Sequence, residues 1–230
     1  MRLIKNTQDL LTSLKLDAKS GLPIRNFQID SRKVTKNSVF FGLTGSNEDG
    51  SLYAKDAIRK GASLAIVKKS KILNPSVKSS KIILVKSPEK CLIESAKVAM
   101  GRYKGNVIGV TGSNGKTTTK NILKNCIKNS YATFQNYNNE IGLPLCALEL
   151  DSKNTAAIFE MGATKLGDID FLSNIIKPNI GIITHIGHSH LDGLNSVRGV
   201  LEVKSELISN IKKDGIAIVP DGKYLNHWKK

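Results

Sequence analysis

Short apolar runs alternate with amphipathic stretches along the whole chain. Runs such as 63–67 (SLAIV) and 180–184 (IGIIT) are short and rich in β-branched residues, which favours buried strands. The stretches between such runs carry apolar residues at helical spacing. This regular alternation of strand and helix predicts an α/β fold with a largely parallel sheet.

The pattern separates into two successive groups of elements. In the first group we expect strands at 39–43, 63–67 and 81–85, a helix at about 52–60 that ends at Gly61, and a helix from Pro88 to about Tyr103. In the second group we expect strands at 106–111, 131–134, 155–160, 180–184 and 215–219, with helices at 115–129, 141–149, 168–176 and 196–211. The repeated β-α order of the second group favours a doubly wound sheet with right-handed crossovers.

The predicted elements divide the chain into a small α/β domain over residues 1–86, a linker helix over 87–105 and a second domain over 106–230. A prior of about 150 residues per domain leaves room for two domains in 230 residues. The start of the chain mixes charge into every turn and has no apolar run that would predict a signal peptide or a membrane span. The three cysteines have no C-x-x-C spacing, so reduced thiols are expected. These features predict a cytoplasmic protein.

The chain is strongly basic, with a formal net charge of +16. Such a charge suits an anionic partner, which could be nucleic acid, a membrane surface or a phosphorylated substrate. The lysines are scattered, and aromatic residues make up only 5% of the chain, which leaves few stacking platforms for single-stranded nucleic acid. A diffuse lysine-rich surface is therefore the preferred interpretation, and no nucleic-acid partner is expected.

The sharpest motif is 111–118 (TGSNGKTT), between a predicted strand and a predicted helix. Glycines let backbone N–H groups surround phosphate oxygens, Lys116 can reach the β- and γ-phosphates, and the Thr117 hydroxyl can bind Mg²⁺. The strict phosphate-loop pattern requires glycine where this chain has Val110, so the motif is a variant loop. The alternative is a glycine-rich turn without phosphate. The expected nucleotide-binding residues are Gly112, Ser113, Asn114, Gly115, Lys116, Thr117 and Thr118.

Two other strands end in reactive residues, and parallel sheets place their sites beyond such ends. Strand 155–160 ends in Glu160, a candidate Mg²⁺ ligand, although a surface or helix-capping glutamate is the alternative. Strand 180–184 runs into His185, His188 and His190. A zinc site is conceivable there, but no cysteine accompanies these histidines, so a polar role beside the nucleotide or no role at all is favoured over zinc.

Lys204 falls inside the apolar stripe of the helix predicted at 196–211. Glu202 and Glu206 do not share its face, so an i,i+4 ion pair does not explain this lysine. A lysine aimed at a core must snorkel to solvent, lower its pKa or serve in chemistry. The other members of the stripe are Val197, Val200, Leu201, Ile208 and Ile211.

Several ordered motifs resemble the Mur ligase family. The loop 111–118, the run 136–144 (NYNNEIGLP) and 160–162 (EMG) are similar to the central ATPase domain of these enzymes, as is the later pairing of 190–192 (HLD) with 204–206 (KSE). Upstream, 30–34 (DSRKV) and 39–43 (VFFGL) are similar to the UDP-sugar-binding amino-terminal domain of the members that add D-alanyl-D-alanine. The resemblance covers residues 26–219.

The resemblance implies ATP-dependent joining of D-alanyl-D-alanine to UDP-N-acetylmuramoyl-tripeptide through an acyl phosphate, in peptidoglycan precursor synthesis. ATP and Mg²⁺ are the implied cofactors, and a monomer is expected. Lys116, His190 and Lys204 would be catalytic, Thr117, Glu160 and a carbamylated Lys204 would hold Mg²⁺, and Asp30, Ser31, Arg32, Asn138 and Asn139 would bind substrate. The alternatives are another Mur-type amino-acid ligase, an inactive nucleotide- or UDP-sugar-binding fragment and, more distantly, a basic nucleic-acid-binding domain.

Three features depart from the family pattern. His185 stands where family members usually have asparagine, and Ser51 stands where they have histidine. Family members also continue through the rest of the ATPase domain into a carboxyl-terminal domain, whereas this sequence ends at Lys230. We therefore expect a fragment or truncated homologue that binds nucleotide weakly and does not form the amide bond alone.

Overall fold

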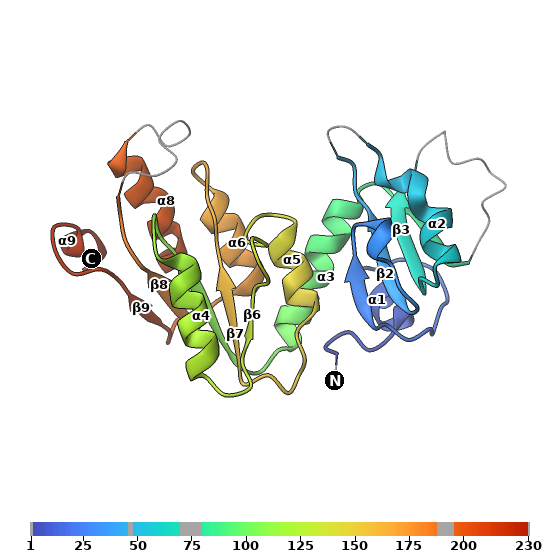
Figure 1. Ribbon diagram of the computed structural model, residues 1–230, viewed down its shortest axis with the longest axis horizontal. Coiled ribbons are helices and arrows are strands. Elements are labelled where there is room, and N and C mark those ends of the chain that lie inside the picture. The colour runs from blue at the N-terminus through green and yellow to red at the C-terminus, as the bar shows by residue number, and fades with distance from the viewer. Residues whose placement is uncertain (1, 46–47, 70–79, 188–195, 230) are drawn as a thin grey trace. The chain divides into compact units, whose positions relative to one another are not determined.

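The computed structural model describes residues 2–45, 48–69, 80–187 and 196–229. The chain divides into two compact units, Met1–Arg102 and Tyr103–Lys230 (Figure 1). Each unit contains one sheet, and all the strand pairs within the two sheets are parallel. The predicted α/β class is confirmed. None of the helices in the described ranges is long and apolar enough to span a membrane.

The first unit is built on a four-stranded sheet whose spatial order follows the chain. Its strands are β1 (Asn26–Gln28), β2 (Ser38–Gly42), β3 (Leu64–Lys68) and β4 (Ile82–Val85). Its helices are α1 (Thr7–Ser13), α2 (Ala54–Arg59) and α3 (Pro88–Arg102), with 3₁₀ turns η1 (Ser31–Lys33) and η2 (Gly50–Tyr53). β2 is buried throughout, as expected for a central parallel strand. The sequence pattern did not predict α1 or β1, which are too short to show a period.

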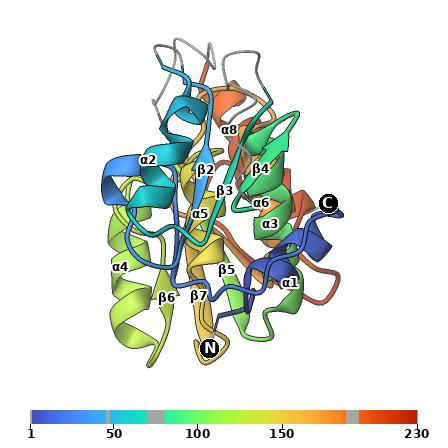
Figure 2. The ribbon, with the colours of Figure 1, turned by 90° about the vertical axis from the view of Figure 1, so that its right-hand side faces the viewer.

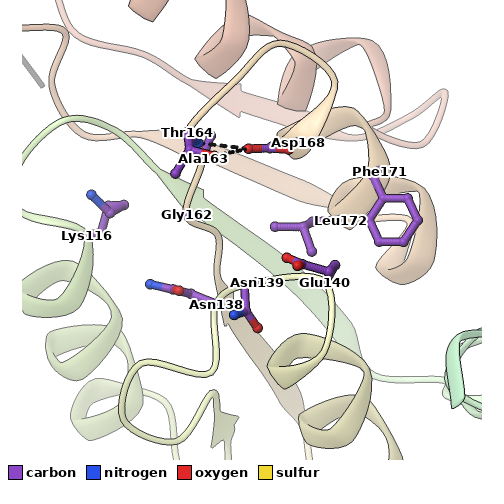
Figure 3. A pocket seen from close by; sticks show the side chains of 10 residues that line it. All are labelled: Lys116, Asn138, Asn139, Glu140, Gly162, Ala163, Thr164, Asp168, Phe171 and Leu172. Carbon is purple, nitrogen blue, oxygen red and sulfur yellow. Dashed lines mark hydrogen bonds between the residues drawn. The ribbon is translucent and has the colours of Figure 1, made fainter. Parts of the chain in front are cut away.

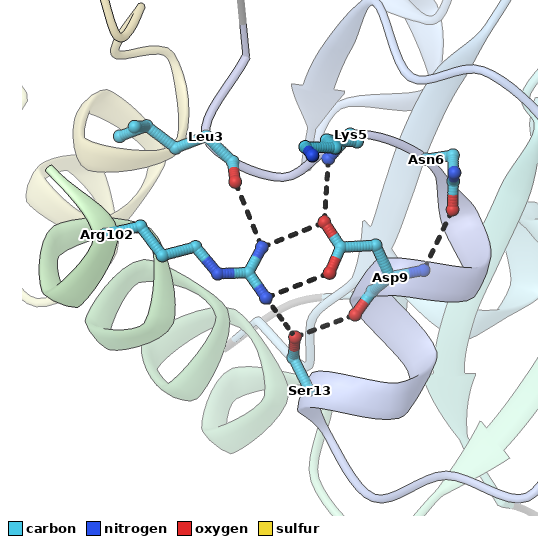
Figure 4. Close-up of polar contacts among 6 residues, drawn as sticks. All are labelled: Leu3, Lys5, Asn6, Asp9, Ser13 and Arg102. Carbon is cyan, nitrogen blue, oxygen red and sulfur yellow. Dashed lines mark hydrogen bonds and ion pairs between the residues drawn. The ribbon is translucent and has the colours of Figure 1, made fainter.

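The helix α3, expected as a linker, packs on β2 and β3 and on α1. Its last residue, Arg102, forms the centre of a polar network (Figure 4). The guanidinium donates to both carboxylate oxygens of Asp9 at 2.8 and 2.9 Å, to the carbonyl of Leu3 at 3.0 Å and to the Ser13 hydroxyl at 3.1 Å. This bidentate pair fastens the end of α3 to α1 and to the amino-terminal segment.

The second unit is built on a five-stranded sheet with the order β6-β7-β5-β8-β9. Its strands are β5 (Asn106–Thr111), β6 (Tyr131–Ala132), β7 (Ala156–Glu160), β8 (Ile180–Ile183) and β9 (Ile216–Ile218). Its helices are α4 (Lys116–Cys126), α5 (Gly142–Leu148), α6 (Asp168–Ile176), α8 (Val197–Ser209) and α9 (Leu225–Trp228). α4 covers one face of the sheet and α6 and α8 cover the other (Figure 2).

Side chains of β5 alternate between these two faces. Ile108 and Val110 join the cluster on the α4 side, where Leu123 and Ile127 pack against them. Gly109 faces the other way, and a Cβ built on it would lie 3.0 Å from the Leu207 side chain of α8. The neighbouring strand places Gly181 in register with Gly109, and a Cβ there would lie 3.1 Å from Leu207. The paired glycines therefore let α8 lie close to the centre of the sheet.

We predict that Arg102→Met lowers the free energy of unfolding by about 1–2 kcal/mol at neutral pH, because Asp9 loses a charged, partly exposed bidentate partner. Partial burial raises the pKa of Asp9, but hydrogen bonds from Arg102 and from the Lys5 backbone outweigh it and hold the pKa below 3.8. A carboxyl group whose pKa is lower in the folded state stabilises the fold at pH values above its pKa in the unfolded chain. This contribution disappears as the pH falls through the pKa of the folded state. The difference between wild type and variant should therefore shrink as the pH falls below about 4.

The measurement is urea denaturation followed by circular dichroism at pH 7 and pH 3. Arg59→Met is the matched control, because Arg59 pairs with Asp56 on the surface and its side chain is 79% exposed. Equal effects of the two substitutions, or a difference between Arg102→Met and wild type that stays unchanged at pH 3, would show that the network does not stabilise the unit.

Candidate functional site

The carboxyl edge of the second sheet brings three chain segments together. β5 lies between β7 and β8, so the strand order reverses there, and open α/β sheets bind ligands beyond strand ends at such a point. β5 continues into the loop 112–115, β7 ends in Glu160, and β8 continues into the segment 184–187. The sequence-predicted phosphate loop and the candidate metal ligand therefore share one edge.

The phosphate loop is braced by the segment that follows β8. The Thr184 hydroxyl donates to the backbone carbonyls of Thr111 at 3.2 Å and Asn114 at 2.5 Å, and the Ser113 amide donates to the His185 carbonyl at 2.8 Å. Gly112 has φ +145°, and a Cβ on it would lie 2.1 Å from Thr184 Oγ1. Only glycine fits this close approach. The sequence did not single out Thr184, because its role depends on pairing between β5 and β8.

Lys116 is the first residue of α4 and curls back over the loop. Its Nζ donates to the carbonyls of Gly112 at 2.8 Å and Ser113 at 3.1 Å. Burial lowers the pKa of Lys116, while the negative charge of Glu160 opposes that shift. A positive charge at the mouth of a glycine-rich loop, at the start of a helix, favours an anion such as phosphate.

Glu160 is buried, with 3% of the residue exposed, and its carboxylate is surrounded by donors. The Thr117 hydroxyl donates to its two oxygens at 3.0 and 3.1 Å, and Asn138 Nδ2 donates at 3.2 Å. A hydroxyl and a carboxylate side by side next to a phosphate loop are the oxygen donors that Mg²⁺ takes in phosphate sites. Thr117 and Glu160 therefore fit a magnesium ion. This carboxylate is not the surface glutamate of the alternative interpretation.

Lys120 is a functional candidate that the sequence analysis missed. It is also 3% exposed, and its Nζ lies 3.2 Å from Glu160 Oε2. The signal was present, because Lys120 follows Thr117 by three residues and so shares its face of α4. Without this counter-charge a buried carboxylate would be costly to keep ionised.

Lys204 lies in the interior of the second unit, on α8. Only 1% of the residue is exposed, which argues against a side chain that snorkels to solvent. Burial lowers the pKa of Lys204 to about 8, and the charge of Lys116 acts in the same direction, while Asp168 and Glu206 act against it. Lys204 thus lies within electrostatic range of Lys116, and more of its amine is neutral at a given pH than in a solvent-exposed lysine.

A cavity of about 370 Å³ opens beside Lys116 (Figure 3). It lies between the segment that holds Asn138 and Asn139 and the segment after β7. Asn139 Oδ1 accepts from the amides of Ile141 at 3.3 Å and Gly142 at 2.8 Å, which fixes the start of α5. The lining residues are Lys116, Asn138, Asn139, Glu140, Gly162, Ala163, Thr164, Asp168, Phe171 and Leu172.

The other predicted substrate residues lie in the first unit, at the carboxyl end of β1. Asp30 begins η1 by accepting from the Arg32 amide, and its carboxylate pairs with the Arg32 guanidinium through two hydrogen bonds of 2.9 Å. The Arg32 side chain is 86% exposed. Ser31 between them is buried. The guanidinium is therefore free to meet an anionic ligand on its outer side.

The histidine cluster is described only in part. His188 and His190 lie outside the described residues, and the His185 side chain is exposed. Among the residues that are described, no group of three or more histidine, cysteine, aspartate and glutamate side chains is placed to hold a metal ion. Ser51, at the other departure from the family pattern, is buried and accepts a hydrogen bond from the Lys68 amide at 3.0 Å.

Comparisons with known proteins match both units. Residues 23–103 match the model described as Mur ligase family, catalytic domain, and residues 110–230 match the Mur ligase middle domain. The chain is 36% identical to a UDP-N-acetylmuramoyl-tripeptide--D-alanyl-D-alanine ligase of Buchnera aphidicola, over 100% of this chain and 50% of that protein. The enzyme of the same name from Bacillus subtilis is also 36% identical, over 85% of this chain and 43% of its own.

Solved structures agree with these matches. A crystal structure of MurF from Acinetobacter baumannii superposes with a TM-score of 0.83 at 28% identity, over 97% of this chain and 50% of that one. MurF ligase from Thermotoga maritima, solved in complex with ADP, gives a TM-score of 0.74 at 34% identity, over 85% and 45% of the two chains. The chain spans about half the length of these relatives. Sequence, fold and site together show that the chain belongs to the Mur ligase family.

Proposed function

We propose that this protein takes part in the ATP-dependent joining of D-alanyl-D-alanine to UDP-N-acetylmuramoyl-tripeptide, a step of peptidoglycan precursor synthesis in the cytoplasm. The observation that carries the proposal is the grouping of Lys116, Thr117 and Glu160 at one sheet edge, within electrostatic range of buried Lys204. The relatives described above carry this activity in their names. The two units would divide the substrates between them.

ATP would bind with its phosphates over the loop 112–115. Backbone amides of the loop and of the start of α4 would donate to the phosphate oxygens. Lys116 would leave the carbonyls of Gly112 and Ser113 and pair with the phosphates instead. Thr117 and Glu160 would hold Mg²⁺. When bound, the metal ion neutralises charge on the phosphates. Phosphoryl transfer depends mainly on such positioning and electrostatic stabilisation.

The cavity beside Lys116 would receive the carboxyl end of the tripeptide, with Asn138 and Asn139 at its border. A carboxylate oxygen of the tripeptide attacks the γ-phosphorus, and the bond from that phosphorus to ADP breaks. The amine of D-alanyl-D-alanine then attacks the acyl carbon, a C–N bond forms, phosphate leaves and the amine loses a proton. Lys116, close to both the loop and the cavity, would stabilise the negative charge in the first step.

Lys204 would act as a carbamate. Its neutral amine attacks CO₂, an N–C bond forms and a proton is released, which leaves an anionic carbamate. This change would replace the repulsion between Lys204 and Lys116 by attraction, and would supply an oxygen ligand for a second Mg²⁺. His190 would support the same metal and phosphate site, a role that rests on the family resemblance alone.

The first unit would bind the UDP-sugar. Arg32 is exposed at the carboxyl end of β1 and can pair with a diphosphate, while Asp30 holds its guanidinium in place. Ser31 and the turn η1 would complete this subsite.

We predict that Lys116→Ala weakens ATP binding by at least about tenfold, because the phosphates lose a charged partner. Binding of the UDP-sugar through the first unit, measured with UDP-N-acetylmuramic acid that carries no peptide, should change by less than about twofold. Calorimetric titration of each ligand measures both effects. Lys128→Ala, at an exposed lysine just after α4, is the matched control.

Equal loss of both ligands from a folded Lys116→Ala protein would contradict the division of substrates between the units. If wild type binds neither ligand but binds DNA with a steep dependence on salt, the proposal fails in favour of a nucleic-acid-binding protein.

We predict that bicarbonate adds the mass of one CO₂ to Lys204. Only the neutral amine reacts, and because the pKa of Lys204 is lowered to about 8, the yield should rise from pH 7 to pH 9. Native mass spectrometry followed by peptide mapping measures the adduct. Lys120 is the internal control, since it is equally buried but its ammonium is paired with Glu160. An unmodified Lys204 at pH 9, or equal modification of Lys120, would contradict the carbamate role.

A further inference from the structure

The amino-terminal end of α6 lacks a cap of its own. Gly167 occupies the N-cap position, with φ +89°, and it has no side chain that could accept from the first backbone amides of the helix. Helices usually satisfy these amides with a serine, threonine, aspartate or asparagine at this position. The first turn of α6 therefore needs an acceptor from elsewhere.

Glu206 of α8 supplies that acceptor. Its Oε1 accepts from the Gly167 amide at 2.7 Å, and its Oε2 accepts from the Asp170 amide at 2.9 Å. These are the N-cap and N3 amides, the two donors that a capping box satisfies within a single helix. Here one carboxylate from a neighbouring helix satisfies both, and its negative charge also suits the positive end of the α6 dipole.

One turn later, Asn210 makes a second tie between the same two helices. Its Nδ2 donates to Asp170 Oδ1 at 2.8 Å. Two successive turns of this part of the chain thus hold the first turn of α6. The contacts are directional, so they fix the orientation of that turn as well as its distance from α8.

The turn that Glu206 holds is one wall of the cavity beside Lys116. Thr164, Asp168, Phe171 and Leu172 line that cavity (Figure 3). Asp168 Oδ2 in turn accepts from the amides of Thr164 at 2.8 Å and Lys165 at 3.0 Å, which ties the loop before α6 to the first residue of the helix. Lys204 lies on α8 only two residues before Glu206. The carboxylate therefore joins α8, the helix that carries the buried lysine, to the α6 wall of the cavity.

We infer that Glu206 is a positioning residue that holds the α6 wall of the cavity in register with Lys204 on α8. The consequence for ligands rests on the proposed function, in which the tripeptide carboxylate enters this cavity. Nucleotide bound over the loop 112–115 should not sense the wall, because that loop is braced by Thr184 and Gly187 instead.

The test compares Glu206→Gln with Glu202→Gln. Glutamine keeps the shape of Glu206, but it turns one acceptor into a donor that faces an amide donor. Glu202 is on the same helix, and among the described residues it pairs only with exposed Arg198, at 3.3 Å, so it is the matched control. Hydrogen exchange resolved to single amides is the first measurement, and calorimetric binding of UDP-N-acetylmuramoyl-tripeptide and of Mg²⁺-ADP is the second.

We expect Glu206→Gln to accelerate amide exchange by about tenfold over the whole segment 164–172, and Glu202→Gln to leave it unchanged. Acceleration confined to the Gly167 and Asp170 amides would show a local cap and would overturn the positioning role. Affinity for the tripeptide ligand should fall by about tenfold and that for Mg²⁺-ADP by less than about twofold. The positioning role would also be overturned if Glu206→Gln weakened binding of both ligands equally, or if it weakened binding of neither.

The exchange measurement needs no ligand, so it decides the positioning role even if wild type fails to bind the tripeptide ligand. That failure would count against the proposed function alone. Asn210→Ala provides a second variant, with a smaller acceleration expected over the same segment because only one hydrogen bond to α6 is lost.

Discussion

The buried carboxylate of Glu160 is the constraint on which the site depends. Two separate segments of the second unit pair with it: α4 through the Thr117 hydroxyl and the Lys120 ammonium, and the segment before α5 through the Asn138 amide. A charge removed from water is costly unless it is fully paired, and removing one partner of such a pair typically costs about 3–5 kcal/mol. The same pairing therefore stabilises the fold and aims a carboxylate at the place where a phosphate-bound metal ion would lie.

Positive charge surrounds that carboxylate. Lys116 and Lys120 approach Glu160, and the charge of Lys116 disfavours the charged form of Lys204. Such a site is incomplete without anions. Phosphate groups would satisfy Lys116, and carbamylation would remove the positive charge of Lys204. The scattered surface lysines that dominate the net charge are a separate matter, and none of them is needed to explain the site.

Local patterns were enough to predict most of the fold and the centre of the site. β-branched runs located the sheet strands β5, β7 and β8, the glycine-rich motif located the turn between β5 and α4, and the helical period identified Lys204 as a buried lysine. The predicted stripe of α8 was wrong in detail. Val203 and Leu207 are buried, whereas Ile208 and Ile211 are only partly buried, because the helix packs against both α6 and the sheet.

The residues that the sequence did not reveal act across elements. Thr184 braces the phosphate loop only because β5 and β8 are neighbours, and Glu206 caps α6 only because α8 packs beside it. Helical periodicity correctly placed Glu206 on a different face of the helix from Lys204. It could not predict that the face of Glu206 packs against the start of α6. Such contacts depend on strand order and helix packing, which no local pattern encodes.

The most direct test of this account is the affinity of the chain for ADP, measured by calorimetry as the Mg²⁺ concentration rises, in wild type and in Glu160→Gln. The account predicts that Mg²⁺ tightens ADP binding in wild type and that this gain shrinks by about tenfold or more in the variant, because a neutral amide is a poorer ligand for a hard cation. ADP affinity without Mg²⁺ should differ by less than about twofold between the two proteins. An equal gain from Mg²⁺ in both proteins would contradict the claim that Glu160 is held in place to bind the metal ion.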